Sequence, residues 1–271
     1  MIFKIFENFL QRYEQKLKEK RKSTKIIPIF VQIKNMNTVI FILAILPVIV
    51  LALYIYKKDK YEKEPLSRLI LAFSLGMLAI PMDLLVVGII NAIIPGGTVF
   101  YQAFFEAGIP EEFCKWALFM MVIWRDRNFD ESFDGIVYAC FIGLGFACVE
   151  NLMYVFGSES YNTALHTGVA RALLSVPGHF LFAVIMGYFL GMAKFKSQQR
   201  GKYLILSFVC PIVVHGLFDY LLMLSSALSE NNLELLGVGL FVIFVYLDIK
   251  LWKIGIKQIA KMKESTGRFH N

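Results

Sequence analysis

Long runs of apolar residues constrain this chain more than any other feature of its sequence. Seven windows of about 20 residues are long enough to cross the roughly 30 Å hydrocarbon core of a bilayer as α-helices. Because a backbone in lipid must satisfy its hydrogen bonds internally, an open sheet is excluded. The sequence therefore predicts an all-α polytopic membrane bundle with about seven transmembrane helices, at residues 38–56, 69–94, 99–124, 134–156, 171–193, 203–226 and 235–252.

The composition agrees with a membrane protein. Apolar side chains make up 57% of the 271 residues and charged side chains 18%, whereas soluble domains average roughly 45–50% and about 25%. The first apolar run begins near residue 38, too late for a cleavable signal peptide, so we expect it to remain as an anchor. The four cysteines lie in apolar segments without a CxxC spacing, which indicates neither a disulfide framework nor a zinc knuckle.

The formal net charge of +7 arises from basic residues at the ends of the apolar runs and gives no indication of nucleic-acid binding. Residues 1–37 form a basic, partly amphipathic N-terminal extension, residues 38–252 the transmembrane domain, and residues 253–271 a basic C-terminal tail. Loops rich in Lys and Arg stay in the cytoplasm, so we expect the first, third and fifth loops and the C-terminus there. The same alternation would place the N-terminal extension outside, and the sequence does not decide its side.

Ionisable side chains lie inside several of the predicted spans. On translocon scales each costs roughly 2.5–3.5 kcal/mol at a helix centre, so such residues are rare and usually functional. They are Glu106, Glu111, Glu112, Lys115, Glu150, His179, His215 and Asp219. Asp83, Arg171 and Asp248 are more easily explained as local or near-end residues.

The third span is interrupted at Gly108 and Pro110, directly before Glu111, Glu112 and Lys115. Proline is tolerated in a first helical turn, and the helix dipole favours the two glutamates there. Lys115 follows the glutamates by four and three residues, so it can pair with either and balance their charge. One lysine leaves one carboxylate unpaired, which suits a general base in a buried site. The alternative is a neutralised ion pair that caps a broken helix.

Three further spans carry the other candidates. These candidates are Glu150 in the fourth span, His179 after a Pro-Gly break in the fifth, and His215 one turn before Asp219 in the sixth. Glu150 and His179, taken singly, are better explained as buried structural residues. At the rise of an α-helix, however, these residues and Glu111 all lie about 9–18 Å from the same membrane face. This convergence in one membrane half favours a single polar site.

Two chemistries fit such a site, and the sequence leaves both open. Two histidines and a glutamate can hold a zinc ion and leave a fourth position for water, with a further carboxylate as base. Without a metal, Glu111 or Glu112 together with a histidine activates the water, and a neighbouring histidine stabilises the oxyanion. The candidate metal ligands are Glu150, His179 and His215, and Asp219 either orients His215 or serves as an alternative ligand.

Three ordered motifs resemble those of the PrsW membrane proteases. The segments EEFCK (111–115), FACVE (146–150) and HGLFD (215–219) match the patterns E-E-x-x-K, F-x-x-x-E and H-x-x-x-D. The helix around His179 and the stretch YEKEPLSR also look like parts of this family. The resemblance covers about residues 38–250, and the motif layout is similar to that of the prenyl-protein endopeptidases of the CAAX type. The basic N-terminal extension departs from the family pattern.

The resemblance implies a peptidase that cleaves membrane-anchored proteins and, for some members, the site-1 cleavage of a bacterial anti-sigma factor. Carried over to this sequence, Glu111 and Glu112 would be the essential acidic pair and His179 the essential histidine, which makes these three the catalytic candidates. Glu150, His215 and Asp219 would complete the site. The family's description as metallopeptidases leaves the identity of the cofactor open.

The sequence thus favours a multi-pass protease of the cell membrane, in contact with lipid, that acts on single-span membrane proteins from a site in the extracytoplasmic half. A membrane proton or metal-ion transporter or sensor is the alternative, because acids and histidines at mid-membrane also form ion pathways. A transporter would be expected to show internal symmetry and polar residues through both membrane halves. Neither is visible here, so the protease hypothesis is favoured.

Overall fold

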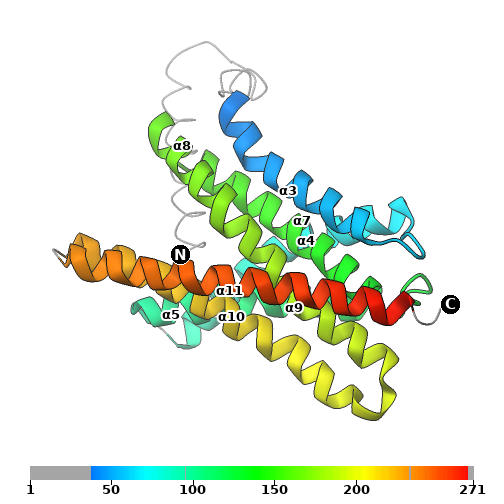
Figure 1. Cartoon of the computed structure of the whole chain (residues 1–271). Helices are drawn as coiled ribbons and strands as arrows, with labels where there is room; N and C mark the ends of the chain where they lie inside the picture. Colours follow the sequence, from blue (N-terminus) through cyan, green and yellow to red (C-terminus); the bar gives the residue numbers. More distant parts are fainter. Residues whose placement is uncertain (1–37, 95, 232, 268–271) are drawn as a thin grey trace.

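The computed structural model describes residues 38–94, 96–231 and 233–267, which form helices joined by short loops and contain no strand (Figure 1). Six of the described helical segments are long and apolar enough to cross a membrane. They are α3 (Thr38–Lys58), α4 (Leu66–Ile93), α7 (Asp134–Phe156), the continuous segment Tyr161–Phe195, α10 (Arg200–Glu230) and α11 (Glu234–Gly267). The prediction of an all-α polytopic membrane bundle is confirmed. The predicted N-terminal extension lies outside the described residues.

The predicted third span is helical but irregular. It consists of α5 (Val99–Ala103), the π-helical turn η1 (Phe104–Gly108), α6 (Ile109–Leu118) and a second π-helical turn, η2 (Phe119–Ile123). This segment holds Glu106, Glu111, Glu112 and Lys115, and these charges explain why it is not among the six apolar helices. The prediction of about seven spans therefore corresponds to six apolar helices and one broken, charged segment.

The fifth predicted span begins earlier than residue 171. The helix α8 (Tyr161–Ala170) continues through the π-helical turn η3 (Arg171–Ser175) into α9 (Val176–Phe195). The side chain of Ser160 caps α8 by accepting a hydrogen bond from the N–H of Thr163 at 3.2 Å. Apolarity alone does not detect α8, because its sequence YNTALHTGVA is largely polar. Arg171 consequently lies inside a continuous helical segment and not near its end.

Two of the π-helical turns occur directly before proline. Pro110 follows η1 by two residues, and Pro177 follows η3 by two residues. Proline has no N–H for the usual bond to the carbonyl four residues earlier, and its ring crowds that carbonyl, so a wider turn relieves both problems. These turns shape the segments that carry the acidic pair and His179.

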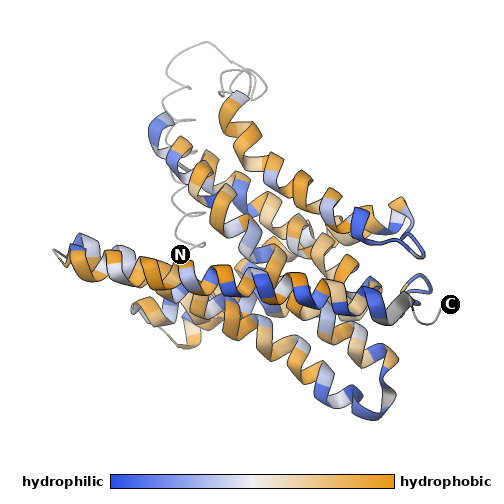
Figure 2. Cartoon of the chain, viewed as in Figure 1, coloured by the Kyte–Doolittle hydropathy of each residue, from blue (hydrophilic) through white to orange (hydrophobic). Residues whose placement is uncertain are grey.

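The core of the bundle is formed by α7 and α9. They pack against each other, α7 also contacts α3 and α4, and α11 lies along α9 and α10 (Figure 1). Within the segments able to cross a membrane, 72% of the α7 window is buried but only 11% of the α11 window. Apolar residues run along most of α3 and much of α11 (Figure 2). Both helices therefore present apolar faces suited to lipid, and the polar candidates lie in the interior.

The stretch YEKEPLSR links α3 to α4 and ties this loop to α7. Glu64 is buried, its backbone N–H donates to the Asp59 carboxylate at 3.2 Å, and its own carboxylate accepts a hydrogen bond from the hydroxyl of Tyr138. Burial raises the pKa of Glu64 to about 7 and that of Asp59 to about 6. The loop thus anchors the first two spans to the helix that carries Glu150.

The crossing of α4 and α7 depends on two glycines. A Cβ added at Gly76 would lie 1.9 Å from the backbone oxygen of Ile142, and one added at Gly145 would lie 2.0 Å from the backbone oxygen of Phe73. Such distances are far inside van der Waals contact, so even one methyl group must push the two backbones apart. Small residues permit this close approach of helices in membranes.

We expect Gly76→Ala to destabilise the protein by about 1–3 kcal/mol, the usual effect of overpacking. Gly88→Ala on the same helix is the matched control, because a Cβ at Gly88 meets nothing within 4 Å. The measurement is the unfolding temperature of each purified variant in detergent. Equal unfolding temperatures for the two variants would contradict the assigned crossing.

Candidate active site

A buried cavity of about 140 Å³ lies where α6, α7, α9 and α10 meet. Its polar wall comprises Glu111, Glu150, Arg171, His179, His215 and Asp219, and its apolar wall includes Phe182, Phe218 and Leu222. Apart from Asp219, which is partly exposed, these polar residues are buried. The structure therefore brings five predicted site residues from four helices to one cavity, and the other two, Glu112 and Lys115, lie beside it.

Lys115 binds both glutamates of the EEFCK motif. Its ammonium lies 2.7 Å from Glu112 Oε1 and 3.2 Å from Glu111 Oε2, and all three residues are buried. The same ammonium lies 3.2 Å from His179 Nδ1 and 4.0 Å from the ring centroid of Phe146. The phenylalanine of the FACVE motif thus covers the lysine in a cation–π contact. Spacing along the sequence did not indicate this role for Phe146.

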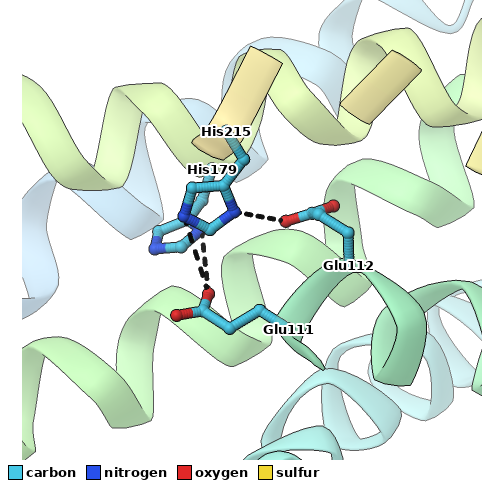
Figure 3. A group of neighbouring side chains, drawn as sticks. All are labelled: Glu111, Glu112, His179 and His215. Carbon is cyan, nitrogen blue, oxygen red and sulfur yellow. Dashed lines mark hydrogen bonds and ion pairs between the residues drawn. The ribbon is translucent and has the colours of Figure 1, made fainter. Parts of the chain in front are cut away.

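His215 lies between the two glutamates (Figure 3). Its Nδ1 is 2.9 Å from Glu112 Oε1, while its Nε2 is 3.4 Å from Asp219 Oδ2 and 3.9 Å from Glu111 Oε2. A carboxylate can only accept, so Nδ1 donates to Glu112. This bond directs Nε2 toward Glu111, and the ring of Phe182 stacks on the imidazole at 4.5 Å.

His179 is held through both ring nitrogens. Its Nε2 lies 2.8 Å from Glu150 Oε2, and its Nδ1 lies 3.2 Å from the Lys115 ammonium and 3.9 Å from Glu111 Oε2. Because an ammonium can only donate, Nδ1 accepts and Nε2 donates its proton to Glu150. Glu150 therefore orients His179, and its carboxylate also accepts a bond from Arg171 at 2.6 Å.

The donor set of the cluster fits a divalent metal ion. Ligand atoms of Glu111, Glu112, His179 and His215 all lie within 4.8 Å of one another, and all four residues are buried. The second oxygen of Glu112, Oε2, is buried and has no hydrogen-bond partner among the described residues. Imidazole nitrogen and carboxylate oxygen are the ligands that zinc takes in catalytic sites.

This group differs from the predicted ligand set of Glu150, His179 and His215. Glu150 lies beside the group and not within it, because its carboxylate faces the outer nitrogen of His179 and the guanidinium of Arg171. The acidic pair of the EEFCK motif lies in this group together with the two histidines. Asp219 lies next to His215, as the one-turn spacing predicts.

The structure buries two residues, Arg171 and Asp83, that the sequence analysis set apart from the site as local or near-end residues. Arg171 contacts Glu150, and Asp83 on α4 is fully buried, with neither carboxylate oxygen hydrogen-bonded to a described residue. A buried charge is costly wherever it occurs in the chain, so intramembrane position is the signal that could have marked both. Glu106 also lines the cavity and accepts a hydrogen bond from Asn91 at 3.1 Å. Asp248 is not among the residues that line the cavity.

Comparison with known proteins agrees with the motifs. Residues 64–247 match the family described as PrsW family intramembrane metalloprotease. The chain is 34% identical over 227 residues to Protease PrsW of Clostridioides difficile, a match that covers 82% of this chain and 90% of that protein. It is 38% identical over 217 residues to Protease PrsW of Geobacillus kaustophilus, covering 80% and 89%. No solved structure matches the chain.

A third relative supports the same conclusion. Protease PrsW of Bacillus subtilis is 34% identical over 220 residues, covering 81% of this chain and 93% of that protein. The matched region contains all three motifs and every residue of the buried cluster. The resemblance seen in the sequence is confirmed, and the chain belongs to the PrsW family of intramembrane metalloproteases and is a membrane protease.

Proposed function

We propose that this protease is an endopeptidase that cleaves single-span membrane proteins with a water molecule activated by Glu111. One observation carries the assignment of the base. Glu111 Oε2 lies 3.9 Å from His179 Nδ1 and 3.9 Å from His215 Nε2, and the residue lines the cavity. Glu112 instead uses Oε1 to hold Lys115 and His215. Glu111 is therefore the glutamate placed to receive a proton.

The proposed reaction is a hydrolysis with one proton relay. Glu111 accepts a proton from water as the water oxygen bonds to the scissile carbonyl carbon. The bond from this carbon to nitrogen then breaks, and Glu111 returns the proton to the leaving amine. In a reaction without metal, the protonated form of His215 donates from Nε2 to the negatively charged oxygen, while its Nδ1–H donates to Glu112 and holds the ring.

A divalent metal, with zinc as the candidate, belongs to the same proposal. With the ion bound, His179, neutral His215 and Glu112 would hold it, which leaves Glu111 as base. The ion would polarise the scissile carbonyl as a Lewis acid. The donor set of the buried cluster supports this proposal.

The substrate proposal extends the family resemblance. A bacterial anti-sigma factor with one transmembrane helix is the candidate, cut at the first site of a proteolytic cascade. A cavity of about 140 Å³ is too small to admit an intact α-helix, which is about 10–12 Å wide with its side chains. A substrate helix must therefore unwind at the scissile bond to reach Glu111.

The proposed location of the site is the extracytoplasmic half of the cell membrane. The loops after α4, α7 and α10 contain no Lys or Arg, whereas those after α3 and η2 contain two each and the one after α9 contains Lys196, flanked by Lys194 and Arg200 at the helix ends. Loops rich in these residues stay in the cytoplasm. Glu150 lies six residues before the end of α7 and Arg171 opens the π-helical turn after α8, so the cavity is near the face with few basic residues.

Cysteines placed singly at Gly97, Ser158 and Ser229 are expected to react with an impermeant thiol reagent added to intact cells. Cysteines at Lys60 and Lys196 are expected to react only after the cells are opened. The unmodified chain is the control, because its own cysteines are buried or half-buried. The opposite labelling would invert the topology and move the proposed cut to the cytoplasmic end of the substrate helix.

The proposed activity is tested with purified protein in detergent and a panel of single-span membrane proteins, with and without a chelator. We expect cleavage of at least one substrate at one position within or beside its transmembrane helix, and loss of cleavage with chelator. Cleavage that persists in chelator, in protein free of metal, would support the glutamate mechanism without metal. If none of the single-span proteins in the panel is cleaved, the result would count against the proposed substrate class.

A further inference from the structure

Arg171 makes three contacts with one face of α7. Its Nη2 donates to Glu150 Oε2 at 2.6 Å, its Nε donates to Asn151 Oδ1 at 2.8 Å, and its guanidinium carbon lies 4.0 Å from the ring centroid of Tyr154. Only 11% of the Arg171 side chain is exposed. The planar fork of arginine, unlike the single ammonium of lysine, can bind two acceptors at fixed angles.

The contacts of Arg171 extend to the first span. Asn151, which accepts from Arg171, donates from Nδ2 to the backbone oxygen of Ala44 on α3 at 2.7 Å. Arg171 is itself the first residue of the π-helical turn η3, so the backbone that carries it is set by the turn before Pro177. Two residues of α7 thus bind the guanidinium, and one of them, Asn151, is itself held by α3.

Glu150 connects this guanidinium to the catalytic cluster. The same oxygen, Oε2, accepts from Arg171 Nη2 and from His179 Nε2. A carboxylate held by a single partner can rotate about its terminal torsion angles, whereas a second, charged donor to the same oxygen restricts that freedom. The orientation of the His179 ring, and with it the direction of Nδ1 toward Glu111, depends on where Glu150 Oε2 lies.

We propose that Arg171 is a positioning residue for proteolysis: it fixes the carboxylate of Glu150, which in turn holds the ring of His179 in the orientation that directs Nδ1 at Glu111. This inference rests on the proposed function of the cluster as the peptidase site. It predicts that Arg171 affects the chemical step only through Glu150. A substrate-binding arginine would instead act on the Michaelis constant.

The kinetic test is a double-substitution cycle. Arg171→Met should lower kcat about 10–100-fold, the usual loss when a partner of a site residue is removed, with KM changed less than about threefold. Arg171→Lys should give an intermediate kcat, because it keeps the charge and loses the fork. In a Glu150→Gln background, Arg171→Met should change kcat less than about threefold, because coupled residues are not additive. Arg127→Met, at an exposed position in the loop before α7, is the matched control.

A second readout does not need activity. In protein labelled with ¹⁵N-histidine, the Nε2–H signal of His179 is assigned by its loss in His179→Gln. We expect this signal to shift or to exchange with water in Arg171→Met and to remain in Arg127→Met. If Arg171→Met fails to elute as a folded protein in size-exclusion chromatography, Arg171→Lys serves for both readouts, with a smaller change expected.

The outcomes separate this proposal from the proposed function. An unchanged His179 signal overturns the role of Arg171 whatever the kinetics. A raised KM with unchanged kcat, or the full loss of kcat in both backgrounds, also overturns it. If the wild-type protein cleaves nothing, the proposed function fails, and the His179 signal still decides whether Arg171 positions the ring.

Discussion

Glu111→Gln is expected to lower kcat for cleavage about 10³-fold, within the range that general-base catalysis contributes. The amide keeps the size and shape of the side chain but cannot accept the proton of the attacking water. The contact of Glu111 with Lys115, at 3.2 Å, is the longer of the two glutamate–lysine contacts, so the fold should survive the change. The measurement is single-turnover cleavage of one substrate by purified protein.

Glu230→Gln is the matched control for this prediction, because Glu230 is exposed at the end of α10. It should cleave at the wild-type rate. Glu112→Gln should also abolish cleavage but lower the unfolding temperature as well, since Glu112 holds both Lys115 and His215 and a buried partner is left unpaired. Full activity in Glu111→Gln would contradict its role as base, and full activity in both variants would remove the acidic pair from the mechanism.

Substitution of either cluster histidine is expected to remove bound metal and activity together. His179→Ala and His215→Ala each delete one nitrogen from the group of four ligand atoms within 4.8 Å, and catalytic zinc sites use three protein ligands. We expect about one metal ion per wild-type chain and a loss of at least tenfold in either variant. Elemental analysis of the purified proteins measures the bound metal, and the cleavage assay measures the activity of the same preparations.

His166→Ala on α8 is the control for this pair, because His166 is exposed. It should retain both metal and cleavage. Full activity of a preparation shown to be free of metal would contradict the metal-assisted reaction. It would leave Glu111 as base and give the two histidines the role of hydrogen-bond donors to the oxyanion.

The sequence predicts the fold well because each apolar run must cover one bilayer thickness. It also predicts which residues lie at one depth, since helical rise converts sequence position into height. Height does not give the rotation of a helix about its axis. Glu111 and Glu112 face His215 while Glu150 faces the outer side of His179, and these directions depend on how each helix is rotated about its axis. The predicted ligand set of Glu150, His179 and His215 stays a prediction, and a metal analysis of Glu150→Gln would test it.

Arg171 and Asp83 show a second limit. Arg171 is the first residue of an apolar run, where an arginine side chain can reach the interface between membrane and water. The helix α8, which is polar and capped at Ser160, precedes this run and places Arg171 inside a longer helical segment. Asp83 is a single acid in an otherwise apolar helix, and its complete burial follows from the packing of α4 against α6 and α7. Contacts between helices distant in sequence determine both outcomes.

The most direct test is intact-mass analysis of a single-span substrate reconstituted with this protein in proteoliposomes. Hydrolysis by this protein should give two fragments whose masses add up to the substrate plus one water molecule. The cut should lie near the substrate end on the side of the loops with few basic residues, and no fragments should form with Glu111→Gln. An intact substrate, together with a flux of protons or divalent cations that depends on Glu111, would contradict the account and establish a transporter.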